Sequence, residues 1–242
     1  MTTDTKPKRH VMVQARYVRA LAKFAGTENS RYYLHGIYTH PVPEGGVAMI
    51  ATNGHIMGII LDSQGMCNGA HLNSIPKDLI AATRKKQDAK KEPEPRYVTF
   101  SGDNAIMTAG NYSTLDCSDK FPPDTGIVLD PSILYAAHAP EIDGRFPDYA
   151  RVIPTHAVRN STLLCFNPKF LATFGEAVDI LRNRGDLNSL TLIGTGNNEP
   201  AIVVSDVAPE LTGIIMPMRG FPAQWVQDRT SAIPQWIRSL AK

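Results

Sequence analysis

The chain has 242 residues, of which 43% are hydrophobic and 20% charged, as is usual for a folded globular protein. Its longest uncharged apolar run, 56–61, is far shorter than the ~20 residues that span a bilayer. The polar, basic segment Met1–His10 lacks the apolar core of a secretory signal. We therefore exclude the membrane and secreted classes and expect a cytoplasmic protein. The net charge of +2 does not by itself indicate nucleic-acid binding.

The sequence offers little that predicts catalysis. Its three cysteines, Cys67, Cys117 and Cys165, are widely spaced and form no CxxC pair, so we expect reduced, mostly buried thiols. No two of the seven histidines are four residues apart, and no phosphate-binding loop or nucleophile elbow is present. Asp143 and Asp148 with a histidine form the best acid and base candidates, but the surrounding glycine and proline indicate a structured loop. We expect no enzymatic activity, no metal and no cofactor.

The first repeat unit follows a short arm, residues 1–10, that has nothing to bury and is predicted to be flexible. A strand is predicted over 11–14 and a helix over 15–25, where apolar residues fall at helical spacing. Asn53-Gly54 is typical of a tight hairpin, because both residues accept a positive φ. Three antiparallel strands complete the unit, predicted over 32–38, 47–52 and 56–61.

The second unit begins at Pro76, which opens a helix with Leu79, Ile80 and Thr83 facing inward. The helix continues into the charged run 84–91, and the prolines of 92–95 end it. The region 118–144 is predicted to be a loop at 121–123 with a short helix over 131–139. Strands are predicted over 97–100, 105–109 and 112–117, with turns at 102–104 and 110.

The third unit begins near Ser161, and Asn167 is a suitable N-cap before Pro168. The apolar stripe of its helix consists of Leu171, Phe174, Val178 and Leu181. Strands are predicted over 190–193, 201–205 and 213–216, and the tail with both tryptophans, 220–242, belongs to no unit. Three units of one helix followed by antiparallel strands predict an internal structural repeat and an α+β fold.

Positive charge gathers on the first two predicted helices. Arg16, Arg19 and Lys23 share one helix face. Such an array can neutralise phosphates without reading bases. Taken alone, however, the pattern favours a solvated helix face, and on the third helix the cations are offset by Glu176 and Asp179. The cations of the second helix are Lys77, Arg84, Lys85 and Lys86.

Four stretches of the sequence resemble the bacterial sliding clamp, the beta subunit of DNA polymerase III, and occur in that family's order. Residues 31–36, RYYLHG, are similar to the family's R-Y-Y-L-x-G strand, and 51–55, ATNGH, to its A-T-D-G-H hairpin. Residues 143–154 are similar to D-G-R-F-P-D-Y-x-R-V-x-P, and 216–219 match M-P-M-R. In two places the chain departs from the family: Asn53 replaces Asp, and Ile56-Met57 replace Arg-Leu.

The resemblance implies a DNA-clamp fold of about one and a half clamp domains. Residues 11–155 are expected to form a complete clamp-like domain with an insertion near 118–140, and 161–219 half of another. Residues 1–10 are then a flexible arm and 220–242 a C-terminal extension, which we expect to pack beside the pocket described next. Clamp rings of this family contain twelve such units. Three units per chain therefore imply a homo-tetramer, or a trimer if the insertion supplies a fourth unit.

The resemblance also implies a non-enzymatic, DNA-encircling processivity or tethering factor. It reverses the solvated-face interpretation of Arg16, Arg19 and Lys23, which are then expected to face double-stranded DNA. It further implies a hydrophobic pocket for peptides of a DNA polymerase and a clamp loader. The alternative is a clamp-like adaptor or decoy that does not encircle DNA. The positions that match the family's pocket are Leu34, Thr52, Gly54, His55, Met57, Pro154, Ile214, Met216, Pro217, Met218 and Arg219.

Overall fold

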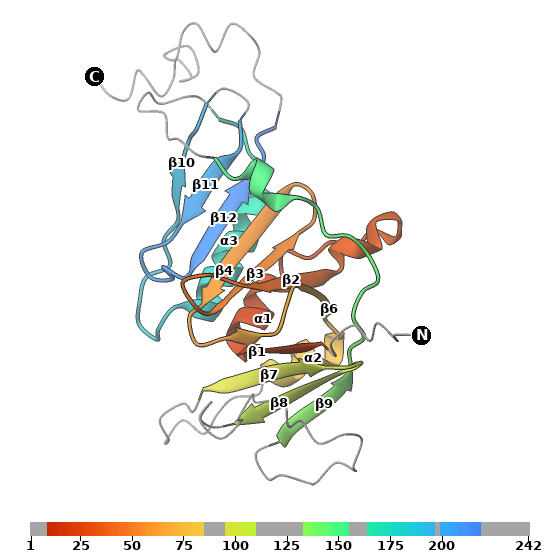
Figure 1. The fold of residues 1–242 in the computed structure, drawn as a ribbon. Coiled ribbons are helices and arrows are strands. Elements are labelled where there is room, and N and C mark those ends of the chain that lie inside the picture. The colour runs from red at the N-terminus through yellow and green to blue at the C-terminus, as the bar shows by residue number, and fades with distance from the viewer. Residues whose placement is uncertain (1–8, 85–94, 110–132, 155–163, 197–198, 219–242) are drawn as a thin grey trace, which may run out of the picture.

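The computed structural model describes residues 9–84, 95–109, 133–154, 164–196 and 199–218. Three α-helices and two antiparallel sheets are found there (Figure 1). The helices are α1 (Ala15–Leu21), α2 (Lys77–Thr83) and α3 (Pro168–Leu181). No described helix has the length and apolarity needed to cross a membrane.

The structure has one strand, β6 (His71–Ser74), ahead of α2; with β6 counted as the start of the second unit in place of Pro76, the first two units exchange their first strands. The five-stranded sheet has the order β5-β1-β7-β8-β9, so β1 of the first unit pairs with β7 of the second. The strand before α2, β6, pairs in turn with β2 of the first unit. This exchange ties the two units into one body. The strands of the five-stranded sheet are β1 (His10–Gln14), β5 (Met66–Cys67), β7 (Arg96–Ser101), β8 (Asn104–Ala109) and β9 (Ile133–His138).

The third unit extends the other sheet, which has seven strands in the order β10-β11-β12-β4-β3-β2-β6. Its strand β12 pairs with β4 in antiparallel register, and Gly213 lies opposite Gly58. Beneath this junction α3 packs on α1, and the Phe24 and Phe174 ring centroids are 5.0 Å apart. The strands are β2 (Gly36–Pro41), β3 (Val47–Thr52), β4 (Ile56–Asp62), β6 (His71–Ser74), β10 (Thr191–Ile193), β11 (Ala201–Val204) and β12 (Leu211–Ile215).

Local signals predicted several elements correctly. The hairpin at 53–54 is present: Gly54 has φ 89°, and the Asn53 carboxamide oxygen accepts hydrogen bonds from the His55 and Ile56 amides at 2.9 and 3.0 Å. Asn167 caps α3 by accepting from the amide of Lys169 at 3.0 Å. The described strands at 11–14, 47–52, 56–61, 97–100, 105–109, 190–193, 201–205 and 213–216 are confirmed within two residues.

The helix predicted over 15–25 ends at Leu21, because the amides of Lys23 and Phe24 bond to carbonyls three residues back and tighten the chain into a turn; Lys23 therefore lies beyond α1. Two other predicted elements are wrong. Residues Asn29–Leu34 form a 3-10 helix, η1, in place of the first part of the strand predicted over 32–38. It buries Leu34 in the core and leaves Tyr32 half exposed, which an extended chain leading straight into β2 would not allow. The short helix predicted over 131–139 is the strand β9, because pairing with β8 outweighs a weak local helix preference. Strands β5 and β6 were not predicted.

The expected flexible arm ends earlier than predicted. Arg9 is 3% exposed and His10 begins β1, so both belong to the folded body. Cys67 and Cys165 are unpaired thiols that are only half-buried, and burial raises the pKa of the Cys67 thiol. The predictions for Cys117, the strand over 112–117, the loop at 121–123, the charged run beyond Arg84 and the tail 220–242 lie outside the described residues.

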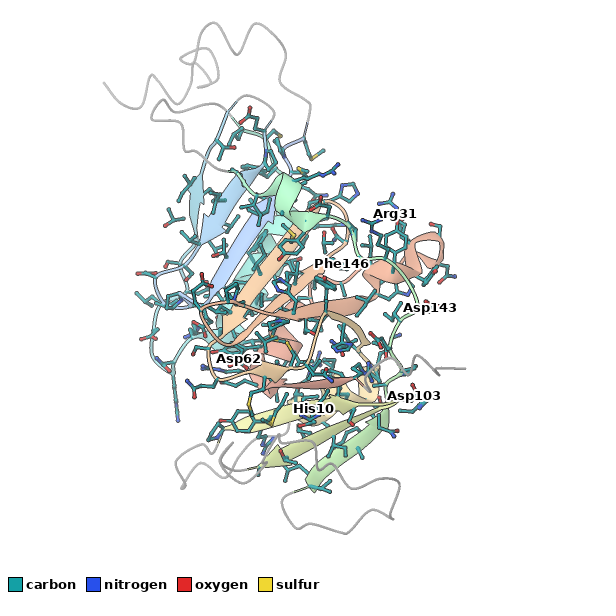
Figure 2. All side chains as sticks on the ribbon, viewed as in Figure 1. His10, Arg31, Asp62, Asp103, Asp143 and Phe146 are labelled. Carbon is teal, nitrogen blue, oxygen red and sulfur yellow. The ribbon has the colours of Figure 1, made fainter. Side chains whose placement is uncertain are left out.

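The position of His10 predicts how stability depends on pH (Figure 2). Burial and then the charge of His71 lower the pKa of His10 from its ordinary value of 6.5. Below that pH the unfolded chain therefore binds more protons than the folded chain, and stability falls as the pH falls. We expect urea denaturation of the wild type to lose more free energy of unfolding between pH 7.5 and 5 than His10→Gln does. Equal losses in the two proteins would contradict this role.

Candidate functional site

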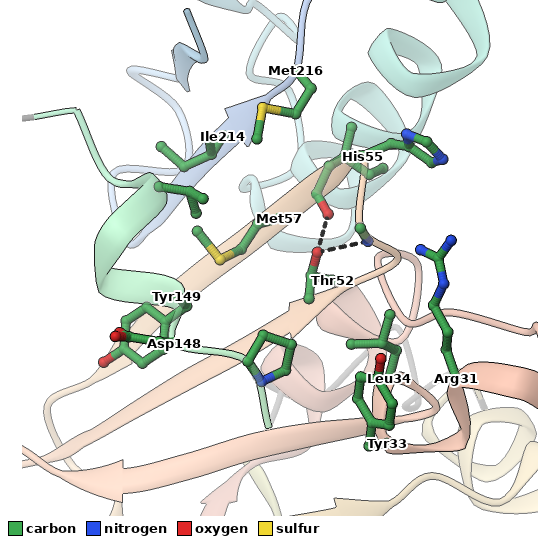
Figure 3. Close-up of a pocket in the computed structure, with 14 residues that line it drawn as sticks. Arg31, Tyr33, Leu34, Thr52, His55, Met57, Asp148, Tyr149, Ile214 and Met216 are labelled. Atoms are coloured by element: carbon green, nitrogen blue, oxygen red, sulfur yellow. Dashed lines mark hydrogen bonds between the residues drawn. The ribbon is translucent and has the colours of Figure 1, made fainter. Parts of the chain in front are cut away.

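An apolar pocket of about 320 Å³ opens where the first and third units meet (Figure 3). Four segments surround it: η1, the β3–β4 hairpin, the segment 147–152 that contains the 3-10 helix η3 (Tyr149–Val152), and the end of β12. The residues that line it are Arg31, Tyr33, Leu34, Thr52, Gly54, His55, Ile56, Met57, Pro147, Asp148, Tyr149, Val152, Ile214 and Met216.

The hairpin keeps its shape through its own hydrogen bonds. The Thr52 hydroxyl donates to Ile56 O at 2.7 Å and accepts from the Gly54 amide at 3.0 Å. Gly54 also allows close approach of Arg31, because a Cβ there would lie 2.9 Å from Nη1. Thr52 and Gly54 therefore shape this edge of the pocket, and the Thr52 hydroxyl is already satisfied within the protein.

The floor of the pocket is apolar and rests on the junction between the two units. Leu34, Met57 and Ile214 are each at most 4% exposed and belong to one hydrophobic cluster with Phe146. Met57 on β4 lies directly opposite Ile214 on β12. Because methionine and aliphatic side chains adapt to different shapes, this floor suits apolar ligand groups. It exists only because β12 pairs with β4.

Charged and aromatic groups form the rim. Arg31 pairs with Glu28 at 3.4 Å, and Asp148 pairs with Arg151 at 2.8 Å, both in exposed positions. The His55 ring stacks against Phe170 of α3, with centroids 5.5 Å apart and planes 17° apart. An apolar floor with separated charges at the rim favours a ligand that combines apolar anchors with polar ends.

Seven of the positions matched to the family's pocket lie together around this cavity: Leu34, Thr52, Gly54, His55, Met57, Ile214 and Met216. Three others do not line it. Pro154 follows η3 and lies beyond the wall, where Pro147 and Val152 stand instead. Pro217 and Met218 leave the cavity because the Met218 amide donates to Cys165 O at 2.7 Å, which turns the chain toward the segment before α3. Arg219 lies outside the described residues.

Several lining residues were not assigned to the pocket from the sequence. Tyr149, Asp148 and Pro147 belong to the D-G-R-F-P-D-Y stretch, so the motif that carried the resemblance also contained the missing wall. Arg31 and Tyr33 belong to the R-Y-Y-L-x-G motif, of which only the leucine was assigned. Complete motifs would therefore have been better guides than single matched positions.

A second, polar groove of about 610 Å³ runs between α1 and α2. Arg19, Lys23, Lys77 and Arg84 contribute its cations. Burial and then the nearby charge of Arg84 lower the pKa of Arg19. The structure thus brings cations of two helices together with like charges facing one another, as expected for a surface that receives an anion.

Two of the predicted cations have partners within the protein. The Arg16 guanidinium lies over the Tyr17 ring, 4.8 Å from its centroid, and 3.8 Å from a Glu210 carboxylate oxygen. Lys23 Nζ is 2.5 Å from Glu176 Oε2. Lys85 and Lys86 lie outside the described residues. Arg19, Lys77 and Arg84 are therefore the strongest candidates for contacts with an external anion.

The part of the chain that the structure describes holds no cluster of three or more histidine, cysteine or acidic residues that would bind a metal ion. The acid and base candidates do not converge either. Asp148 forms an ion pair with Arg151. Asp143 lies on an exposed loop, and its backbone carbonyl oxygen accepts a hydrogen bond from the Tyr32 hydroxyl at 3.1 Å.

The architecture is an α+β clamp fold, in which helices and antiparallel sheets repeat. No family model matches the sequence. The beta sliding clamp of Caulobacter vibrioides strain NA1000 is 28% identical over 146 residues, which cover 57% of this chain and 31% of that protein. The same values hold for the clamp of strain CB 15. The chain thus spans about a third of the length of the curated relatives it matches.

Solved structures agree with this fold. The DnaN clamp of Bartonella birtlesii bound to griselimycin superposes with a TM-score of 0.55 at 16% identity, covering 91% of this chain and 69% of that one. A Pseudomonas aeruginosa clamp gives a TM-score of 0.57 with the same identity and coverage. The chain is a distant homologue of the bacterial beta sliding clamps, a non-enzymatic family.

Proposed function

We propose that this protein is a sliding-clamp-like factor that encircles DNA and tethers partner proteins to it in the cytoplasm. In this proposal residues 11–155 form a clamp-like domain and 161–219 half of another. The observation that carries it is the pocket, because the four motif regions that resemble the clamp family converge on it although they are far apart in the sequence. The proposed ligands are short peptides of a DNA polymerase and a clamp loader.

The shape and polarity of the pocket support a peptide ligand. A cavity of about 320 Å³ lies at the lower end of the range in which small ligands are bound. It accommodates a few apolar side chains, while the Arg31 and Asp148 ends are suited to polar groups. We expect a fluorescein-labelled hexapeptide with leucine and phenylalanine anchors to bind. Griselimycin, which the Bartonella structure contains, is a second probe.

A charge at the pocket wall tests this function. Met216→Lys places an ammonium group at the apolar wall, and we expect the hexapeptide to bind at least about tenfold more weakly because that charge loses solvation on contact. Fluorescence polarisation measures the change. Met66→Lys is the matched control, because Met66 is a partly exposed methionine on β5, in the other sheet. Equal affinity in both variants would contradict peptide binding at this pocket.

The groove between α1 and α2 supports contact with the DNA backbone. The double variant Arg19→Glu/Arg84→Glu reverses two charges in the groove. It should weaken duplex binding by about tenfold or more and reduce the dependence of binding on salt. Titration of labelled duplex DNA at two salt concentrations measures both effects. Arg145→Glu is the control, since Arg145 is an exposed cation on the loop before the pocket. An unchanged salt dependence in the double variant would contradict DNA contact through this groove.

We further propose a closed homo-oligomer, with a tetramer favoured over a trimer by the count of repeat units. Within the described residues β9 and β10 end the two sheets, each paired on one side only, so each sheet has an edge on which another copy can pair. Light scattering at micromolar concentration tests the ring. A monomer alone would overturn it.

One observation favours the second candidate, a clamp-like adaptor or decoy that binds peptides without encircling DNA. Arg16 on α1 and Lys23 just after it are paired with Glu210 and Glu176, so less positive charge is free there than the sequence predicts. Peptide binding without measurable duplex binding by the wild type would select this alternative.

A further inference from the structure

The pocket wall formed by residues 143–152 is held to the sheet by aromatic side chains. The backbone hydrogen bond of its helical turn is local, from Ile153 N to Ala150 O at 3.3 Å. Phe146 stacks on Tyr38 of β2, with ring centroids 4.9 Å apart and planes 3° apart. Side chains of β2 therefore help to hold this wall, together with Tyr32 of η1, whose hydroxyl donates to Asp143 O at 3.1 Å.

His40 makes the second contact between β2 and the wall. It lies two residues after Tyr38 and thus on the same face of the strand. Its Nε2 is 2.6 Å from the Tyr149 hydroxyl oxygen, and the two ring centroids are 6.0 Å apart. Its Nδ1 is 2.9 Å from Pro41 O. One imidazole thus connects the strand backbone to a residue that lines the pocket.

The partners of His40 determine where the protons lie. A carbonyl oxygen only accepts, so Nδ1 carries the proton and donates to Pro41 O. In the neutral imidazole Nε2 then presents a lone pair, and the Tyr149 hydroxyl donates to it. Burial, followed by Tyr38 and Asp148, raises the pKa of Tyr149, so its phenol keeps that proton at neutral pH.

We propose that His40 is a positioning residue of the pocket, which fixes the Tyr149 ring at the place where it forms the wall against a bound peptide. The inference rests on the peptide-binding function proposed above and goes beyond it, because it assigns the position of one pocket wall to a strand residue that does not itself line the cavity.

Binding of the labelled hexapeptide tests the role of His40. We expect His40→Leu and Tyr149→Phe each to weaken binding by about five- to tenfold, the size expected for one lost hydrogen bond. The double variant should lose no more than either single variant, because both remove the same bond. His40→Gln keeps an acceptor and should recover part of the affinity. His138→Leu, at an exposed position on β9, is the matched control and should bind normally.

A second measurement does not depend on the ligand. Nitrogen-15 NMR of the histidine side chains should show His40 protonated at Nδ1 in the wild type and altered in Tyr149→Phe. Protonation at Nε2 would overturn the assignment. Normal binding by His40→Leu, while Met216→Lys binds weakly, would overturn the role of His40 and leave the pocket function standing. Failure of the wild type to bind the peptide would overturn the pocket function and, with it, this inference.

Discussion

Gly213→Ala is expected to lower the free energy of unfolding by about 2–3 kcal/mol, the upper part of the range for overpacking a core. A Cβ at Gly213 would lie 2.1 Å from Cε1 of Phe174, whose side chain is fully buried. The ring cannot move freely because it packs against Phe24, whose Cδ2 would itself lie 2.7 Å from a Cβ at Gly58. The two glycines face each other across β4 and β12, so the substitution strains the junction itself.

Urea denaturation followed by circular dichroism measures this loss. Gly175→Ala is the matched control, because a Cβ there meets only Asn188 Nδ2 at 3.9 Å and alanine is the better helix former. Phe174→Leu in the Gly213→Ala background should restore part of the stability by making room. A Gly213→Ala protein as stable as the wild type would show that the junction yields easily, contrary to the geometry.

Arg9→Met is expected to lower the free energy of unfolding by about 3 kcal/mol. The guanidinium donates to Gly102 O at 2.6 Å and to Ala139 O at 2.5 Å, and Nη1 is 3.3 Å from Asn73 Oδ1. Methionine fills the space of the stem but leaves these buried acceptors without their donor, and each such loss costs about 1–3 kcal/mol. The bonds join β1 to the turn between β7 and β8 and to the chain that leaves β9, so we expect the whole domain to be destabilised.

The same denaturation experiment compares Arg9→Met with a matched control, Arg151→Met. Arg151→Met changes an arginine whose side chain is 83% exposed and should alter stability by less than about 0.5 kcal/mol. Arg9→Lys should recover only part of the loss, because an ammonium group lacks the planar fork that reaches several acceptors at once. Equal stabilities of Arg9→Met and Arg151→Met would contradict a structural role for Arg9.

Much of the fold could be predicted because its signals are local. The β3–β4 hairpin needed only Asn53-Gly54 between two apolar runs, and α3 needed only its cap and its apolar stripe. The prediction failed where distant contacts outweigh local preference. Tyr32 and Tyr33 favour a strand by composition, yet burial of Leu34 requires a helical turn. Arg9 was assigned to the arm because the residues that accept its hydrogen bonds are distant in the sequence.

The pocket, like the fold, could be predicted only in part from the sequence. Its residue types follow from motifs, so Leu34, Met57 and Ile214 were available to sequence reasoning. The Tyr149 wall was not, because its place depends on aromatic contacts with β2, more than 100 residues away.

The sequence alone determined the repeat units, the apolar faces of the helices, the hairpin and the resemblance to sliding clamps. These depend on periodicity and on short-range hydrogen bonds. The tertiary structure alone decided the exchange of β1 and β6, the joining of the third unit through β4 and β12, and hence the floor of the pocket. The physical reason is that strand partners are chosen by which apolar surfaces can be buried together, and that choice is made only when distant segments meet.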